Sequence, residues 1–324
     1  MLTATDLIGK NVLLRADLDV PIKDGRVGNS YRLEALLPTL RLCLENAHRT
    51  CLIGHLGRPE GADPAFSLSP VLEELKRLLN EPISFIVSGY SPGECWTGEF
   101  PLALMENLRF DSREEKLDRG FGTLLSTGAD LYVYEAFANY RPSTSLQIIP
   151  ELLPTFAGLR FDLEIATLGQ VLNNPKHPTL LLASGAKLDK LEILKTIMPK
   201  FDRTLLGGKL ASPEHLTSDG LDLNQNTTNL FLEVISQART IVLNGPLGYY
   251  EDEVHSKATQ AVLQALKTNS ALTILGGGDT LDAIPTLGFA YSDFSFVSTG
   301  GGAMLEFLAT GSHPLLDILQ RRTP

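Results

Sequence analysis

Short apolar runs that alternate with amphipathic stretches are the feature that most restricts how this chain can fold. The run at 11–18 (NVLLRADL) is strand-like, whereas residues 31–47 place leucines at helical spacing, from Leu33 to Leu44. The alternation continues to about residue 137 with further strand-like and helical runs. This β–α rhythm is typical of a mostly parallel sheet with helices on both faces.

The same rhythm returns in the second half, where the strand-like runs end in glycine. These runs are PTLLLASG, RTLLGG, RTIVLNG, LTILGGG and SFVSTGG, which begin at 178, 203, 239, 272 and 295. Between the halves, residues 158–174 have the pattern of one long helix. We therefore expect an α/β protein with two Rossmann-like parallel-sheet lobes joined by a hinge helix, divided as 1–157, 158–310 and a tail of 311–324.

Composition limits the function. A chain of 324 residues with a net charge of −10 has the size of two domains and lacks the basic balance that nucleic-acid binding requires. Its three cysteines are odd in number and have no metal-site spacing, which favours the reducing cytoplasm. No run of about 18 apolar residues occurs, so we expect no membrane partner.

The glycine-rich strand ends of the second half predict a phosphate-rich ligand. In open α/β sheets, ligands bind beyond the carboxyl ends of the strands, and the helix that follows offers free N–H groups to an anion. The two commonest nucleotide-binding motifs are missing from the sequence: the P-loop pattern G-x-x-x-x-G-K-[ST], and the dinucleotide-binding pattern G-x-G-x-x-G after a strand. Asp279, directly after a triple glycine, could hold Mg²⁺ or cap the following helix, and both roles are compatible.

The first half instead carries cationic and polar residues at or just after its predicted strands. They are Arg15, Asp17, Arg32, His55, Arg58, Arg109 and Arg141. Arginine binds carboxylate and phosphate groups with two parallel hydrogen bonds. Any one of these arginines could instead form a surface ion pair, and His55 could be structural. Their common placement at one sheet edge favours a small, highly anionic substrate.

Seven segments in order resemble the motifs of the phosphoglycerate kinase family. They are RADLDVP (15–21), GHLGRP (54–59), ENLRF (106–110), SGAK (184–187), NGPLGYYE (244–251), GGGDT (276–280) and STGGGAMLE (298–306). The resemblance implies an N-terminal lobe that binds 3-phosphoglycerate or 1,3-bisphosphoglycerate, a C-terminal lobe that binds ADP or ATP with Mg²⁺, and a hinge that closes them. It also implies that the tail returns toward the N-terminal lobe.

The resemblance assigns roles to individual residues. Asp17, Asp19, Arg32, His55, Arg58, Arg109 and Arg141 are expected to bind the phosphoglycerate substrate. Gly185, Lys187, Lys190, Gly207, Gly208, Asn244, Pro246, Gly248, Glu251, Gly277, Gly278, Asp279 and Thr280 are expected to bind the nucleotide, with Asp279 on Mg²⁺ and Glu251 on the ribose. Arg32, Lys187 and the backbone at Gly301 are expected to stabilise the transferring phosphoryl group. The phosphoglycerate carboxylate is already ionised, so His55 is not assigned as a base.

The sequence departs from the family pattern at several positions. Asp19 stands where the family usually has Asn, Lys190 comes one residue early after Lys187, and Arg141 is one residue short of its usual spacing. The largest departure is a deletion: only ten residues separate GGKLA, which ends at Ala211, from DLNQNTTNLF at 222–231. The family carries at least one βα unit in that gap, as part of the adenine pocket wall, so we expect a trimmed nucleotide lobe.

Two functions remain open at this point. The first is an active phosphoglycerate kinase that catalyses the reversible transfer and works as a cytoplasmic monomer on small molecules. The second is a catalytically impaired binding protein on the same fold. Retention of Arg32, Lys187 and Asp279 favours the enzyme.

Overall fold

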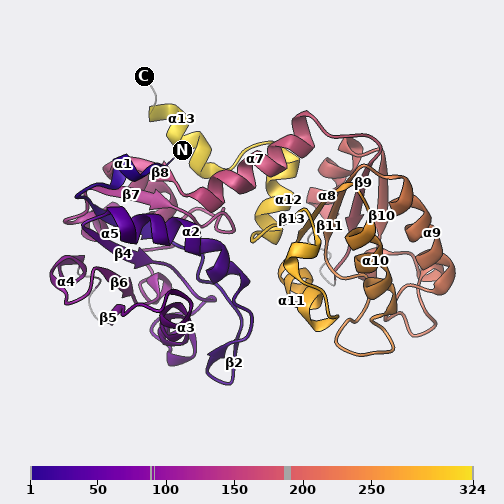
Figure 1. The fold of residues 1–324 in the computed structure, drawn as a ribbon, viewed down its shortest axis with the longest axis horizontal. Helices are drawn as coiled ribbons and strands as arrows, with labels where there is room; N and C mark the ends of the chain where they lie inside the picture. Colours follow the sequence, from indigo (N-terminus) through magenta and orange to yellow (C-terminus); the bar gives the residue numbers. More distant parts are fainter. Residues whose placement is uncertain (1, 88–89, 91, 186–190, 323–324) are drawn as a thin grey trace. The chain divides into compact units, whose positions relative to one another are not determined.

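The computed structural model describes residues 2–87, 90, 92–185 and 191–322, and it divides into two compact units (Figure 1). The first unit contains residues 1–165 and 312–324, and the second contains residues 166–311. Of the described helices, none is both long and apolar enough to cross a lipid bilayer.

The first unit is built on a parallel sheet with the strand order β5-β6-β4-β1-β7-β8. Its strands are β1 (Asn11–Arg15), β4 (Arg49–Ile53), β5 (Ser84–Ile86), β6 (Leu102–Met105), β7 (Leu131–Tyr134) and β8 (Thr155–Ala157). A small antiparallel hairpin adds β2 (Ile22–Lys23) and β3 (Arg26–Val27). The central strand β1 is buried along most of its length, as expected for a sheet covered on both faces.

The helices of the first unit alternate with these strands in the chain. They are α1 (Ala4–Leu7), α2 (Tyr31–Asn46), α3 (Ser69–Leu79), α4 (Pro92–Thr97), α5 (Arg119–Ser126), α6 (Ile149–Leu152) and α13 (Pro314–Arg322). The core beneath α2 and α3 is aliphatic, with fully buried leucines such as Leu14, Leu36 and Leu75. The tail helix α13 contacts the turn 144–148 and α6, so it belongs to this unit.

The second unit is built on a parallel sheet with the strand order β10-β9-β11-β12-β13. Its strands are β9 (Thr179–Ala183), β10 (Arg203–Leu206), β11 (Thr240–Asn244), β12 (Leu272–Gly276) and β13 (Phe296–Val297). Its helices are α8 (Leu191–Ile197), α9 (Gln225–Gln237), α10 (Lys257–Thr268), α11 (Gly278–Thr286) and α12 (Gly301–Thr310). Helix α9 packs beside α10 and α8 beside α12, as two helix layers on one sheet require.

The long helix predicted between the halves is α7 (Leu159–Asn173), which crosses the division between Ile165 and Ala166. Both parallel sheets agree with the predicted fold class, and the strand runs and the helix at 31–47 appear where the hydrophobic pattern indicates them.

Candidate functional site

In the first unit, three neighbouring strands bring three of the predicted substrate residues to one edge of the sheet. The strands β6, β4 and β1 are adjacent and parallel, so their carboxyl ends lie side by side. Asp17 follows β1, His55 follows β4 and Arg109 follows β6. The chain topology therefore brings together residues that lie far apart in the sequence, at the edge where ligands of α/β sheets bind.

His55 is held as a neutral side chain by its surroundings. Its side chain is almost fully buried, and the Arg15 guanidinium donates a hydrogen bond of 2.6 Å to His55 Nδ1. Burial, and then the positive charges of Arg15 and Arg109, hold the pKa of His55 well below its usual range. Because arginine can only donate, the ring proton is on Nε2, so His55 can donate to an anion but is poorly suited to accept a proton.

Asp17 and Arg32 form a second part of this cluster. Arg32 Nη1 lies 3.5 Å from Asp17 Oδ1 and donates to the backbone carbonyl of Asp19 at 2.6 Å. Burial raises the pKa of Asp17, and the Arg32 charge offsets part of that shift. Asp17 Oδ2 is buried and has no hydrogen-bond partner within the described residues. An acceptor of this kind is suited to a hydroxyl donor supplied by a ligand.

Asp19 has a structural partner that the sequence does not reveal. Its Oδ1 accepts a hydrogen bond of 2.9 Å from the backbone N–H of Gly57. The carboxylate that replaces the family's usual Asn thus ties the loop after β4 to the loop after β1. Part of its charge is satisfied by this donor, which reduces the repulsion expected toward an anionic substrate.

Arg109 is fixed against the same loop. Its Nη1 donates to the Gly57 carbonyl at 2.7 Å, and its Nε lies 3.3 Å from Glu115. The buried side chain of Asn107 donates to the carbonyls of Leu56 and Phe66, while its oxygen accepts from the Arg109 backbone N–H. Asn107 was not predicted as a site residue, although it lies inside a motif that pointed to the family.

The two remaining predicted arginines are exposed. The charge of Arg58 acts on His55 and contributes to its lowered pKa, so this residue lies near the cluster. No contact among the described residues links Arg141 to it. Sequence reasoning gave no role to Ser145 and Glu114, which fix the position of Arg15. Arg15 Nε donates to Ser145 Oγ at 3.0 Å, and that hydroxyl donates to Glu114 at 2.6 Å.

In the second unit, the strand order has its reversal point between β9 and β11. The chain starts at β9, adds β10 on one side and then continues on the other side with β11, β12 and β13. Ligands of doubly wound sheets bind at such a point, outside the carboxyl ends of the strands. Gly185 follows β9 there, and Asn244 ends β11, followed by Pro246.

The turns at this edge are packed so closely that they require glycine. Gly245 has a φ of 99°, and a Cβ there would overlap the backbone carbonyl of Ser184. The Ser184 hydroxyl donates to the Pro246 carbonyl, and the backbone N–H of Gly245 donates to Thr280 Oγ1 at 2.9 Å. Thr280 is therefore a structural part of the edge, and its hydroxyl in turn donates to the Gly276 carbonyl.

Two helices begin side by side at this edge. Gly277 precedes α11 with a φ of 112°, and a Cβ on Gly301, the first residue of α12, would overlap the Gly277 backbone. Asn244 Nδ2 donates to the Gly301 carbonyl at 3.2 Å. Each helix start carries unpaired N–H groups and about half a positive charge, so two adjacent starts favour a phosphate group.

Asp279 lies in the first turn of α11, where it is exposed. Among the described residues, no group of three or more His, Cys, Asp or Glu could hold a metal ion by itself. A single carboxylate beside a phosphate-binding backbone fits Mg²⁺, because this ion keeps several waters and takes its remaining ligands from substrate phosphates. The donor set therefore suits an ion that arrives with a nucleotide.

Those of the other predicted nucleotide residues that the structure describes lie around the same edge. Gly207 and Gly208 follow β10, and the Gly208 backbone N–H donates to the Leu247 carbonyl at 3.1 Å. Burial, and then carboxylates that include Glu251 and Asp279, raise the pKa of Tyr250, which places the loop after β11 near the start of α11. Gly248 is in this loop, and Gly278 is the first residue of α11. Lys187 and Lys190 lie outside the described residues.

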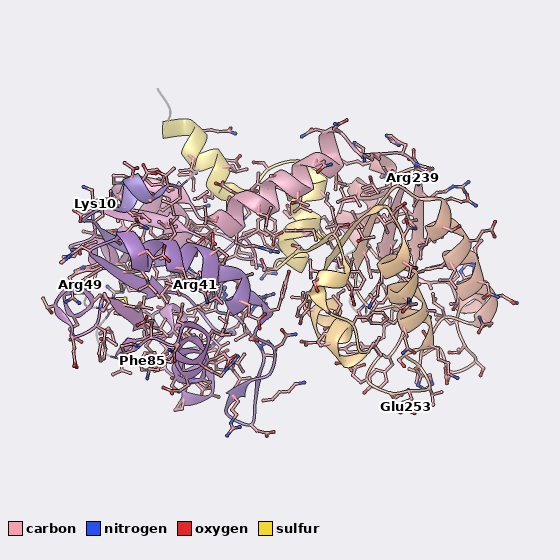
Figure 2. All side chains as sticks on the ribbon, viewed as in Figure 1. Lys10, Arg41, Arg49, Phe85, Arg239 and Glu253 are labelled. Carbon is pink, nitrogen blue, oxygen red and sulfur yellow. The ribbon has the colours of Figure 1, made fainter. Side chains whose placement is uncertain are left out.

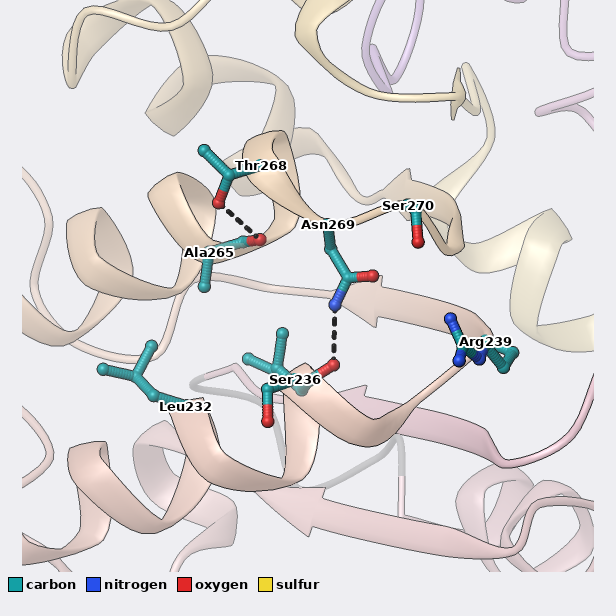
Figure 3. Close-up of a pocket in the computed structure, with 8 residues that line it drawn as sticks. Leu232, Ser236, Arg239, Ala265, Thr268, Asn269 and Ser270 are labelled. Atoms are coloured by element: carbon teal, nitrogen blue, oxygen red, sulfur yellow. Dashed lines mark hydrogen bonds between the residues drawn. The ribbon is translucent and has the colours of Figure 1, made fainter.

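A cavity of about 350 Å³ lies elsewhere in this unit, between the ends of α9 and α10 (Figure 3). Asn269 Nδ2 donates there to the Ile235 carbonyl at 2.7 Å. Arg239 lines this cavity and precedes β11, whereas Glu253 is in the loop after β11. The side chains of Arg239 and Glu253 lie at opposite ends of the unit (Figure 2). Helix carboxyl ends disfavour anions, so this cavity is not the phosphate site.

Comparisons with known proteins cover nearly the whole chain. The family model described as "Phosphoglycerate kinase" matches residues 2–215 and 214–311. A phosphoglycerate kinase of Streptomyces avermitilis is 32% identical over 403 positions, which cover 98% of this chain and 98% of that protein. A phosphoglycerate kinase of Thermus thermophilus is 31% identical, covering 96% of this chain and 97% of that protein.

Solved structures give the same result. A phosphoglycerate kinase from Coxiella burnetii has a TM-score of 0.81 and 28% identity, covering 100% of both chains. One from Pyrococcus horikoshii has a TM-score of 0.87 and 25% identity, covering 99% of this chain and 98% of that chain.

Proposed function

This chain belongs to the phosphoglycerate kinase family, and we propose that it transfers a phosphoryl group reversibly between 1,3-bisphosphoglycerate and ADP, giving 3-phosphoglycerate and ATP. The observation that carries the proposal is the pair of helix starts at Gly277 and Gly301, which lie in contact beside Asp279. Such a backbone favours a nucleotide phosphate.

The first unit supplies the proposed phosphoglycerate site. His55, Arg58 and Arg109 bind the substrate phosphate, with His55 donating from Nε2. Asp17 Oδ2, which is buried and has no hydrogen-bond partner among the described residues, accepts a hydrogen bond from the hydroxyl of the glycerate. Arg32 is fixed by Asp17 and the Asp19 carbonyl, and it stabilises the charge of the transferring group.

The second unit supplies the proposed nucleotide site. The turns at Gly207–Gly208 and Gly185 line the base side, and Glu251 binds the ribose. Asp279 holds Mg²⁺, which neutralises charge on the phosphates when it is bound. The backbone N–H groups at the start of α12 bind the transferring phosphoryl group, and Lys187 is assigned there from the sequence alone.

The reaction needs no protein base. In the direction of ATP use, a carboxylate oxygen of 3-phosphoglycerate attacks the γ-phosphorus, the bond to the β-bridging oxygen breaks, and ADP leaves with that electron pair. The attacking oxygen carries no proton, so the neutral His55 is consistent with a role in binding alone. Positioning and fixed positive charge provide the catalysis.

The test is Mg²⁺-dependent transfer from ATP to 3-phosphoglycerate by the purified protein. Asp279→Ala is expected to lower turnover by roughly a hundredfold or more, because it removes the protein ligand of the metal. Glu233→Ala, which removes an exposed carboxylate from α9 in the same unit, is the matched control and should retain parental turnover.

Each outcome decides between the candidate functions. Transfer by the parent and the control but not by Asp279→Ala supports the kinase with the assigned metal ligand. Full turnover by Asp279→Ala contradicts that ligand. Absence of transfer by the parent, with 3-phosphoglycerate still bound, contradicts the kinase and leaves a binding protein on its fold.

The cellular setting belongs to the same proposal. Cys43, Cys51 and Cys95 are free and buried, which suits a reducing compartment such as the cytoplasm. A net charge of −10 disfavours nucleic acid as a partner. We also propose that the protein is a monomer that acts on small molecules, and sedimentation analysis of the purified protein would check its oligomeric state.

A further inference from the structure

The segment at 212–224, here called the clasp segment, replaces a longer stretch with a small ordered turn. The family match breaks at 214–215, inside this segment. Leu216 and Leu223 form an antiparallel bridge, and the Thr217 backbone N–H donates to the Asp222 carbonyl at 2.8 Å. The segment therefore has its own hydrogen bonds and can act as a fixed support.

Asp222 attaches the clasp segment to the loop after β11. The residue is almost fully buried, and its Oδ2 accepts from the backbone N–H of Ala258 at 3.1 Å. Its Oδ1 lies so close to Gly248 that a Cβ there would overlap it. The Tyr249 backbone N–H also donates to the Leu221 carbonyl at 2.8 Å. The loop at 248–256, here called the nucleotide loop, thus rests directly on the clasp segment.

The His255 ring contacts one carboxylate in the nucleotide loop and one in the clasp segment. His255 Nδ1 lies 2.8 Å from Asp252 Oδ2, and Nε2 lies 2.9 Å from Asp219 Oδ2. Asp252 belongs to the nucleotide loop and Asp219 to the clasp segment. An ionised carboxylate can accept hydrogen bonds but cannot donate them. Both bonds therefore exist together only when both ring nitrogens carry a proton. The His255 side chain is 15% exposed, whereas both carboxylates reach solvent.

We propose that His255 is a positioning residue that joins the clasp segment to the nucleotide loop and thereby sets the affinity of the enzyme for its nucleotide. The inference rests on the proposed function, which places the ribose at Glu251. Glu251 lies on the nucleotide loop between Gly248 and Asp252. Movement of the loop away from the clasp segment would move that carboxylate, so the ring acts on the nucleotide without touching it.

The protonation state of His255 makes its positioning role dependent on pH. The hydrogen bond to Asp252, and then the one to Asp219, raise the pKa of His255. The charged groups that face the ring are Asp252, Asp219 and the nearby Asp222. For a raised histidine pKa, the stabilising charge is present at low pH and is lost as pH rises through the folded-state pKa. Above that pKa one of the two bonds has no proton.

The experiment measures binding of ADP with excess Mg²⁺ by calorimetry, to the parent and to His255→Gln, at about pH 6 and about pH 9. Glutamine is uncharged and carries both of its N–H donors on one nitrogen, so it cannot reproduce a charged ring with a donor at each of the two nitrogen positions. At about pH 6 we expect the dissociation constant of the variant to be roughly threefold to tenfold above the parent, the scale of one lost solvent-accessible charged pair with its loop contact. At about pH 9 the difference should shrink, because the parent has also lost the bridge.

Two further measurements separate positioning from general damage. His215→Gln changes an exposed histidine of the same clasp segment and should bind ADP like the parent. Binding of 3-phosphoglycerate should be the same in all three proteins. In turnover, the KM for ATP should rise in His255→Gln while kcat stays near the parental value.

The outcomes distinguish this inference from the proposed function. If the parent binds ADP and His255→Gln binds it equally well at about pH 6, the inference is wrong and the kinase assignment stands. An equal loss of 3-phosphoglycerate binding would show a general structural role and would also overturn it. If the parent binds no ADP, the proposed function fails, and the inference fails with it.

Discussion

His313 shows how a single buried side chain can be fixed in one protonation state. Its Nδ1 accepts from the Leu315 backbone N–H at 3.2 Å, and its Nε2 lies 3.1 Å from the Phe137 carbonyl, which can only accept. The ring stacks on Phe137 with centroids 5.4 Å apart and meets the edge of Phe161. Neutral imidazole with its proton on Nε2 satisfies both partners.

The protein should therefore lose stability in mild acid through His313. Burial lowers the pKa of His313 from 6.5 to about 4. Between these values the unfolded chain binds a proton that the folded chain does not, so stability falls as pH falls from 6.5 toward 4. The full effect of the shift is about 3 kcal/mol at most.

Urea unfolding of the parent and of His313→Phe across this pH range would check the effect. The variant should show a flatter loss of stability, because it has no ring to protonate at this position. The exposed His48→Gln is the matched control and should follow the parent. Parallel curves for the parent and His313→Phe would contradict the role given to the ring.

At the residue scale, the sequence indicated three side chains that the first unit brings to one sheet edge, but it did not indicate what supports them. Asp17, His55 and Arg109 each follow a predicted strand, so a parallel sheet alone brings them to one edge. Asn107 supports the site by donating hydrogen bonds to backbone carbonyls, and Ser145 supports it by accepting a hydrogen bond from the buried Arg15 guanidinium. Such partners depend on loop conformations that strand and helix patterns do not contain.

At the scale of a single element, the start of α7 is capped by two other segments. Thr39 Oγ1 accepts from the Leu159 backbone N–H at 2.9 Å, and Glu135 accepts from those of Arg160 and Phe161 at 3.0 and 3.2 Å. Carboxyl oxygens at a helix start satisfy backbone donors that have no partner within the helix. Glu135 therefore fixes where α7 begins.

One glycine just before α7 and one inside it should respond in opposite ways to the same change. A Cβ on Gly158, just before the helix, would overlap the Glu135 carboxylate, so Gly158→Ala should destabilise the protein by about 1–3 kcal/mol. Gly169, inside the helix, has only the Asn173 side chain within 4.0 Å of such a Cβ. There alanine should stabilise by about 0.5–1 kcal/mol.

Urea unfolding of the two variants beside the parent would test this pair. Gly169→Ala serves as the control, since both variants add one methyl group to the same region of the chain. A stabilised Gly158→Ala would show that Glu135 does not hold the close position on which the capping depends.

The elements themselves were largely predictable, because each is defined by a local pattern. Helix α7 was expected at 158–174 and is observed at Leu159–Asn173, and α2 was expected at 31–47 and is observed at Tyr31–Asn46. The order of strands in each sheet is a tertiary property and was not predicted. The bridge between Leu216 and Leu223 was also missed, because it lies in a segment without a periodic pattern.

At the scale of the whole molecule, the chain is shorter than its relatives. The alignment with the Streptomyces avermitilis protein runs over 403 positions, whereas this chain has 324 residues, so at least 79 of those positions are gaps in this chain. The break in the family match at 214–215 lies in the segment where the sequence indicates a deletion. The second unit nevertheless keeps a five-stranded parallel sheet.

A trimmed nucleotide lobe should discriminate weakly between bases. The resemblance places the deleted stretch in the wall of the adenine pocket, and the clasp segment is too short to replace a βα unit. A site with hydrogen bonds to the edge of its ligand rejects analogues by roughly 10⁴-fold, whereas a site without them discriminates far less. We therefore expect kcat/KM for ATP to exceed that for GTP by no more than about tenfold, measured with saturating 3-phosphoglycerate. The triphosphate and ribose are the same in both donors, so the ratio reports the base alone. A preference for ATP of about 10⁴-fold would show that the remaining wall around Gly207 and Gly208 still reads the adenine edge, and the open-pocket hypothesis would then be wrong.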